Sequence, residues 1–262
     1  MKTLFLTSSL GGYTKTIKGN EVVKEIVKCN NSNHFIDRLR MAVPKINTFV
    51  FVASNPNGIE KTDEYSNIIV NALNLDDFEI QNKIIIDSRF VGDIEKTILS
   101  ADVVFLAGGN VPMQNKYFNE IKLKLILEKY DGVVIGQSAG SMNCAKTVYT
   151  QPEEPEEFKD KNYQRILKGL CLVDFAIMPH MNTSNEVDEQ GHPTVMQMCL
   201  EDSFAIPHFG ICDYGFIEIK NNIATAYGKT FLIKNGKCVE LCGDGERVAL
   251  SKNMLNNNEI IK

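Results

Sequence analysis

The chain has 262 residues, of which 44% are hydrophobic, and a formal net charge of −5. This length and composition fit one globular unit, so we expect a single α/β domain over 1–262. No run of about 18 apolar residues is present, which argues against a membrane-spanning helix. The basic residues are scattered, which argues against a nucleic-acid surface.

The N-terminus and the cysteines both favour a cytoplasmic protein. The apolar residues near the N-terminus are too few for a signal peptide and fit a first buried strand better. The seven cysteines lack the paired Cys-x-x-Cys spacing of a zinc site, and we interpret most of them as reduced, partly buried thiols. We expect no cofactor and no metal. A homodimer is compatible with the sequence, although no feature requires one.

In the first half of the chain, strand signals alternate with helix signals. This pattern predicts an α/β fold with a largely parallel central sheet flanked by helices. The expected strands are 2–7, 47–54, 78–86, 102–107 and 132–135. The expected helices are 22–29 (after a polar stretch over 11–20), 63–73 with Asp63 as its cap, 91–101 and 112–130.

The second half begins with a short helix over 141–146 and ends in antiparallel strands. Further strand signals lie at 170–178 and in two pieces within 205–219, with a helix expected at 194–200. The remainder, 224–250, alternates apolar and polar residues around the hairpin signal Asn235-Gly236, and we expect it to form antiparallel strands that complete the central sheet. Segment 151–161 is rich in Glu, and we interpret it as a solvated loop from which Glu153 or Glu154 could still reach a site.

One stretch has the pattern of a nucleophile elbow. Gly136-Gln137-Ser138-Ala139-Gly140 directly follows the apolar strand 132–135 and precedes residues that tolerate a helix. A strand, Gly-x-Ser-x-Gly and a helix together raise a serine Oγ above the edge of a sheet, on a strained turn. The alternative is a glycine-rich turn in which Ser138 only caps the helix.

Two other loops leave the carboxyl ends of predicted strands, the edge at which open α/β sheets bind ligands. Gly108-Gly109-Asn110 follows strand 102–107, either as a simple tight turn or as the source of an oxyanion-binding N–H. His180 follows strand 170–178. Among the four histidines, His180 is the best placed general base and His208 the second; the others are His34 and His192.

These motifs, in this order, resemble the dipeptidase E family, which is peptidase family S51. The resemblance covers nearly the whole chain and rests on Ala107 to Asn110, Gly136 to Gly140, Pro179-His180, Gly191-His192 and Gly210-Ile-Cys-Asp213. It implies a fold similar to class I glutamine amidotransferases (flavodoxin-like) and a serine peptidase that cleaves short peptides.

The resemblance also implies the roles of individual residues. Ser138 would be the nucleophile, His180 the general base and Asp213 the orienting acid, with Glu153 as the alternative acid. The oxyanion would accept hydrogen bonds from the backbone N–H groups of Ala139 and of Gly109 or Asn110. We further expect Gln137 and His192 to contact the substrate.

Some features leave other functions open. Members that cleave dipeptides with an N-terminal aspartate carry basic residues after the histidine, but here no Lys or Arg occurs over 169–219. Such specificity would need Arg89, Lys116 or Lys146 to reach the site. A hydrolase with the acid before the histidine would use His192 or His208 with Asp174 or Asp188. A cyanophycinase-like or other amide hydrolase, and a non-catalytic binding protein, remain alternatives.

Overall fold

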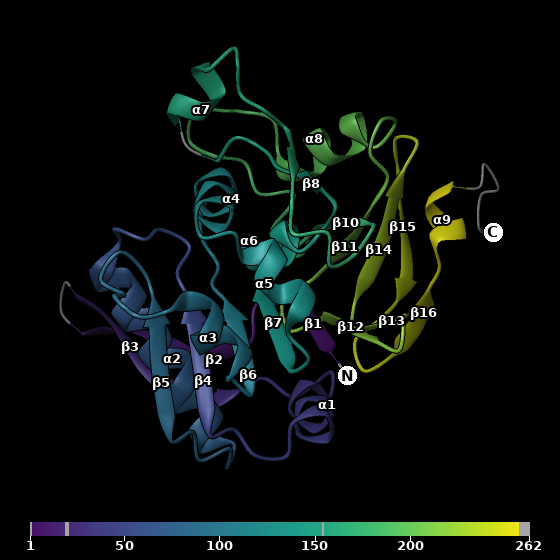
Figure 1. Cartoon of the computed structure of the whole chain (residues 1–262). Coiled ribbons are helices and arrows are strands. Elements are labelled where there is room, and N and C mark those ends of the chain that lie inside the picture. Colours follow the sequence, from purple (N-terminus) through teal and green to yellow (C-terminus); the bar gives the residue numbers. More distant parts are fainter. Residues whose placement is uncertain (1, 19–20, 154, 257–262) are drawn as a thin grey trace.

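The computed structural model describes residues 2–18, 21–153 and 155–256, and its centre is an eight-stranded sheet (Figure 1). The strands of this sheet are β1 (Thr3–Thr7), β4 (Thr48–Val52), β5 (Asn82–Ile86), β6 (Val103–Leu106), β7 (Val133–Gln137), β12 (Phe216–Lys220), β13 (Ile223–Tyr227) and β16 (Arg247–Leu250). Their order is β16-β13-β12-β1-β7-β6-β4-β5. Strands β1, β7, β6, β4 and β5 are parallel to one another. Strands β12, β13 and β16 pair in antiparallel fashion at the other side of β1. The predicted fold class is therefore confirmed.

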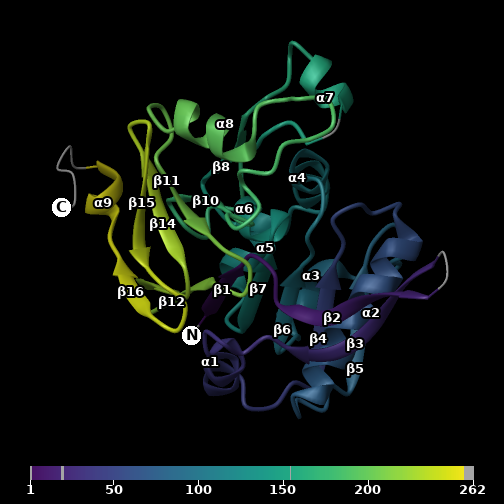
Figure 2. The ribbon, with the colours of Figure 1, turned by 180° about the vertical axis from the view of Figure 1, so that it is seen from behind.

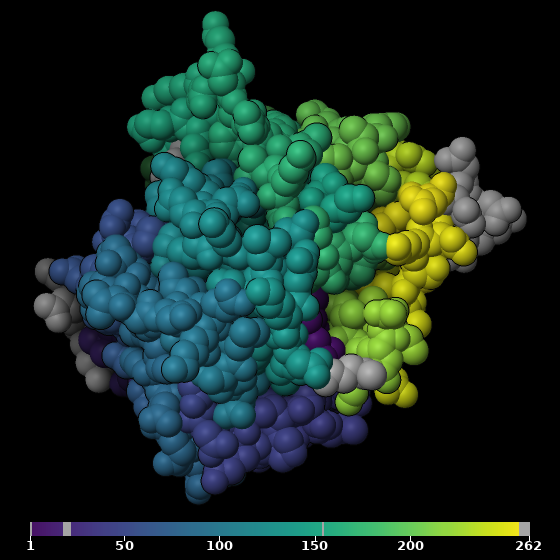
Figure 3. Space-filling view, in the orientation of Figure 1, coloured from purple at the N-terminus to yellow at the C-terminus, as the bar shows by residue number. Residues whose placement is uncertain are grey.

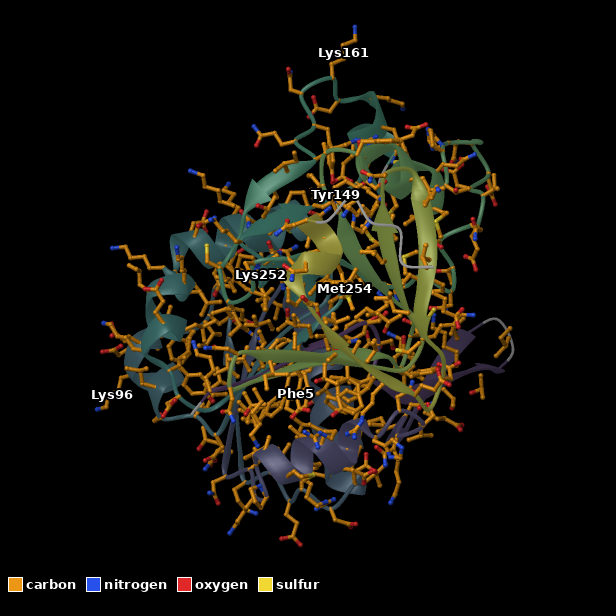
Figure 4. The ribbon with its side chains drawn as sticks, turned by 90° about the vertical axis from the view of Figure 1, so that its right-hand side faces the viewer. Phe5, Lys96, Tyr149, Lys161, Lys252 and Met254 are labelled. Carbon is orange, nitrogen blue, oxygen red and sulfur yellow. The ribbon has the colours of Figure 1, made fainter. Side chains whose placement is uncertain are left out.

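Alternating side chains of the central strands face two separate cores, as a period of two requires. Phe5 and Phe51 face the core that also holds Phe35 and Leu73, and Phe5 lies deep in the molecule (Figure 4). Leu6 and its neighbours face the opposite core. The helices on the first side are α1 (Phe35–Ala42) and α2 (Ile59–Leu75), and those on the second are α3 (Ile94–Leu99), α4 (Val111–Glu120) and α5 (Leu123–Lys129).

A second sheet has the order β10-β11-β14-β15. Its strands are β10 (Ala176–Met178), β11 (His208–Ile211), β14 (Thr230–Lys234) and β15 (Lys237–Cys242). Within segment 224–250, β13 and β16 complete the central sheet as predicted, but the hairpin of β14 and β15 belongs to this second sheet instead. Asn235 and Gly236 both have positive φ, 51° and 71°, so the predicted hairpin turn is confirmed. The remaining elements of this half are α6 (Ala139–Asn143), β8 (Thr147–Tyr149), α7 (Pro155–Lys159), β9 (Ile166–Lys168), α8 (Val195–Asp202) and α9 (Lys252–Asn256).

The predicted helix over 22–29 is wrong. Residues Gly11–Lys18 form β2 and Glu21–Cys29 form β3, an antiparallel ribbon that packs on α2 (Figure 2). Val22, Val23, Ile26 and Val27 have helical spacing, but their branched side chains fit a pleated strand better. The polar stretch 11–18 supplies the partner strand, which a sequence pattern alone does not reveal.

Other boundaries also differ from prediction. The helix over 112–130 is two helices, because Lys122 adopts a left-handed conformation with φ of 54°. Helix α2 begins at Ile59, and Asp63 binds Arg89 instead of capping it. Strand 78–86 starts only at Asn82, and strand 170–178 only at Ala176. No prediction covered α1. Within the described residues, no helix is both long enough and apolar enough to cross a membrane.

Candidate active site

Ser138 stands on a strained turn between β7 and α6. Its backbone angles are φ 52° and ψ −115°, as the elbow pattern predicts. A side chain on either flanking glycine would clash with the backbone. A Cβ at Gly136 would lie 2.8 Å from the N of Ser141, and one at Gly140 would lie 2.2 Å from the carbonyl O of Leu106. Ser138 occupies the N-cap position of α6, but its side chain makes no capping bond to this helix.

His180 lies between Ser138 and Asp213. Its Nε2 is 2.9 Å from Ser138 Oγ, and its Nδ1 is 2.6 Å from Asp213 Oδ1. His180 follows β10, and Asp213 follows β11. Because β10 and β11 are parallel neighbours, their carboxyl ends meet and bring the two side chains together. A positive φ of 57° at His180 turns the chain at the end of the strand.

Asp213 is strongly biased toward its ionised form. Burial alone would raise its pKa, but hydrogen bonds from His180, Ser8 and Asn182, together with the attraction of His180, outweigh burial and lower the pKa to about 2. An ionised carboxylate can only accept hydrogen bonds, so Nδ1 of His180 carries a proton. In the neutral ring, Nε2 is then free to accept the proton of Ser138.

The loop after β6 lies against the elbow. A Cβ on Gly108 would be 3.3 Å from Ser138 Cβ and 3.9 Å from its Oγ. Gly109 has a φ of 148°, and a Cβ there would overlap Ser54 Oγ at 2.1 Å. Asn110 caps α4, because its Oδ1 accepts the N–H of Met113 at 3.0 Å. The structure therefore brings Gly109 and Asn110 to the same sheet edge as Ser138 and Ala139.

Comparison with known proteins identifies the family. The model of peptidase family S51 matches residues 24–227. The chain belongs to peptidase family S51. No curated protein matches the sequence of this S51 chain at a significant level.

Solved structures have a similar fold. A peptidase from an acI-B1 Actinobacterium superposes with a TM-score of 0.63 at 12% identity, over 95% of this chain and 97% of that one. A protein from Listeria monocytogenes EGD-e, named as a candidate peptidase E, superposes with a TM-score of 0.54 at 19% identity, over 96% of this chain and 100% of that one. At these identities the likeness concerns the fold of the S51 chain alone.

The alternative acid of the S51 site, Glu153, lies elsewhere. It is exposed, and its backbone N–H donates to Glu157 Oε2 at 2.8 Å. The Nδ1 position of His180 is taken by Asp213. Glu154 lies outside the described residues. The acidic segment nevertheless reaches the site through Glu157, whose Oε1 accepts from Asn110 Nδ2 at 2.9 Å, a contact that the interpretation as a solvated loop missed.

The two expected substrate residues, Gln137 and His192, have different surroundings. Gln137 ends β7 and is partly exposed. The ring of His192 stacks on Phe158 of α7, with centroids 3.9 Å apart, and its Nδ1 is 2.6 Å from Asp188 Oδ2. The α7 segment protrudes at the end of the molecule, above α4 (Figure 3), and Lys161 points outward from its tip (Figure 4).

The other candidate bases and cations do not join the S51 site. His208 is fully buried, and its Nδ1 is 2.8 Å from the carbonyl O of Ile206. Asp174 is paired with Lys252. Arg89 is held between Asp63 and Asp87, at 2.7 Å from each. Lys116 lies 4.0 Å from Glu120, and Lys146 is exposed. Within residues 2–18, 21–153 and 155–256, no cluster of three His, Cys, Asp or Glu could hold a metal ion.

Two residues of the site were missed by the sequence analysis. Ser8 Oγ is 2.7 Å from Asp213 Oδ1, and Asn182 Nδ2 donates to Asp213 Oδ2 at 3.2 Å. The N–H of Asp213 donates to Asn182 Oδ1 at 2.9 Å. A serine directly after the first strand was the available signal for Ser8, because β1 is parallel to β7 and ends at the same edge.

Proposed function

We propose that this S51 chain is a serine peptidase that cleaves short peptides, with Ser138 as nucleophile, His180 as general base and Asp213 as orienting acid. The observation that carries the proposal is the position of the His180 ring, 2.9 Å from Ser138 Oγ and 2.6 Å from Asp213 Oδ1. Membership of a peptidase family supports the same reaction.

The reaction follows from these contacts. Ser138 Oγ attacks the peptide carbonyl carbon while its proton passes to His180 Nε2. Asp213 stabilises the imidazolium that forms. The oxyanion accepts hydrogen bonds from the backbone N–H groups of Ala139 and of Gly109 or Asn110. Each such hydrogen bond typically contributes about 3 kcal/mol to transition-state stabilisation. His180 then gives its proton to the leaving amine, and water cleaves the acyl-enzyme with His180 again as base.

Two features support short substrates without an acidic N-terminal side chain. The stack of Phe158 on His192 joins α7 to the loop before α8, and Glu157 ties α7 to Asn110. We infer that a segment held in this way beside Asn110 favours a short peptide over a folded chain as substrate. A substrate carboxylate would need a cation, but Arg89 is already paired with two aspartates. Neutral or basic N-terminal residues should therefore be preferred.

The test is release of free amino acids from a panel of short peptides with acidic, neutral and basic N-terminal residues, with Ser138→Ala as control. We expect cleavage by the native protein, weakest for acidic residues, and none by the variant. Cleavage that survives in Ser138→Ala would contradict the proposal. A folded native protein that cleaves no peptide would favour another amide substrate or a binding role without chemistry.

A further inference from the structure

We infer that Ser8 is a positioning residue that fixes His180 against Asp213, an inference that rests on the function proposed above. Ser8 directly follows β1 and is fully buried. Thr7 pairs with Gln137 in the parallel register of β1 and β7, so the next residues on the two strands are Ser8 and Ser138. The central sheet therefore presents two serines side by side to His180.

The hydroxyl of Ser8 contacts both partners of the pair. It accepts the backbone N–H of His180 at 2.8 Å, lies 2.7 Å from Asp213 Oδ1, and is 3.2 Å from His180 Nδ1. A serine hydroxyl has one proton and two acceptor sites. Since the Asp213 carboxylate can only accept, the Ser8 proton points to Oδ1, and the backbone N–H of His180 donates to Ser8 Oγ. The single Nδ1 proton of His180 points to Asp213 Oδ1 at 2.6 Å, with Ser8 Oγ as its more distant neighbour at 3.2 Å.

These bonds hold the backbone and the ring of His180 at once. His180 has a φ of 57°, a conformation that a non-glycine residue adopts only when its surroundings hold it. The bond from its N–H to Ser8 fixes this turn, and the bond from Ser8 to Oδ1 fixes the carboxylate that accepts from Nδ1. Loss of the hydroxyl should let the ring drift from the line between Asp213 and Ser138.

The same hydroxyl also stabilises the charge of Asp213. Oδ1 accepts from both Ser8 and His180 Nδ1. The Ser8 hydrogen bond is one of the contacts that lower the pKa of Asp213 to about 2, so Ser8 helps to keep the acceptor of the Nδ1 proton ionised. Among the described residues, the hydrogen-bond partners of the His180 ring other than Asp213 are the uncharged Ser8 and Ser138. Nearby Cys212 stays neutral, because burial raises its pKa to about 11.

The experiment compares Ser8→Ala and Ser8→Thr with Ser66→Ala, a matched control in a buried serine of α2. The readouts are kcat and KM for a cleaved peptide, and the rate at which a fluorophosphonate labels Ser138. For Ser8→Ala we expect kcat and the labelling rate to be about 10-fold to 100-fold lower, with KM nearly unchanged. Ser8→Thr, which keeps the hydroxyl, and Ser66→Ala should keep kcat and the labelling rate near their native values.

Each outcome is decisive. If Ser8→Ala keeps the native kcat and labelling rate while the native protein is active, Ser8 has no positioning role and the proposed function stands. If the folded native protein neither cleaves peptides nor labels at Ser138, both proposals fall. Should thermal melting show that Ser8→Ala does not fold, Ser8→Cys, a near-isosteric and weaker donor, is expected to lower kcat with KM nearly unchanged, and a native kcat in Ser8→Cys would overturn the inference.

Discussion

At the scale of single residues, the site depends on which carboxylate meets Nδ1 of His180. Asp213 is three-quarters buried and accepts bonds from three side chains, whereas Glu153 is exposed. The sequence analysis named both acids, because the family resemblance indicates only where along the chain the acid lies and not which side chain is close to His180. Only the meeting of two strand ends in space separates them.

The two acids can be separated by neutral amides of similar shape. Asp213→Asn should lower kcat/KM about 10³-fold to 10⁴-fold, because the amide no longer fixes the tautomer of His180 or stabilises the imidazolium. Glu153→Gln, the matched control, should change kcat/KM less than about 3-fold. Steady-state kinetics on the preferred peptide gives both values. If Glu153→Gln strongly lowered kcat/KM while Asp213→Asn changed it little, Glu153 and not Asp213 would be the orienting acid.

At the scale of elements, the sequence predicted what local patterns determine. The apolar runs of β1, β4, β6 and β7 and the glycines of the elbow leave few alternatives, since a strand buried on both faces has a clear signature. The ribbon of β2 and β3 was missed, because its apolar spacing also fits a helix. The break at Lys122 was missed as well, since neither Gly nor Pro marks it.

Helix α7 and its contacts with the site give a prediction at this scale. Phe158→Ala removes the ring that stacks on His192 and so loosens the connection between the two loops. We expect KM for short peptides to rise about 3-fold to 10-fold, since each loop then loses an ordering contact of about 1 kcal/mol. Cleavage of longer peptides should improve relative to short ones.

A matched control exists for this change. Phe204 is 70% exposed and contacts the hairpin at Gly236, away from α7. Phe204→Ala should leave both KM values unchanged. If Phe158→Ala gave the native preference for peptide length, α7 would have no part in substrate selection.

At the scale of the whole molecule, the candidate site joins two sheets. Ser138 and Ser8 come from the central sheet, and His180 and Asp213 come from the second one. A second sheet of this kind was not expected, because its strands are short and lie among loops in the sequence. The residue types of the site could therefore be predicted, but not the way in which sheet packing brings them together.

This junction makes folding stability depend on pH in a specific range. The pKa of Asp213 is lowered to about 2, while an aspartate in an unfolded chain titrates near about 3.9. A lowered pKa contributes stability that is fully present above about pH 4 and is lost as pH falls toward 2. The gap corresponds to about 2 kcal/mol after allowance for the partial exposure of the side chain.

Denaturant unfolding at pH 5 and at pH 2 measures this contribution. The native protein should lose more free energy of unfolding between these pH values than Asp213→Asn does, and the difference should be about 2 kcal/mol or less. Equal losses in the two proteins would mean that Asp213 gains nothing from its partners in the folded state. Because other carboxylates titrate in both proteins, only the difference is interpreted.

The central claim is that His180 and Asp213 activate Ser138. The most direct measurement is the mass of the intact protein after treatment with a fluorophosphonate, followed by mapping of the labelled residue. We expect one adduct on the native protein, located at Ser138, and at least about 100-fold slower labelling in His180→Ala. An adduct at another serine, no adduct on the folded native protein, or equal labelling in His180→Ala would contradict the claim.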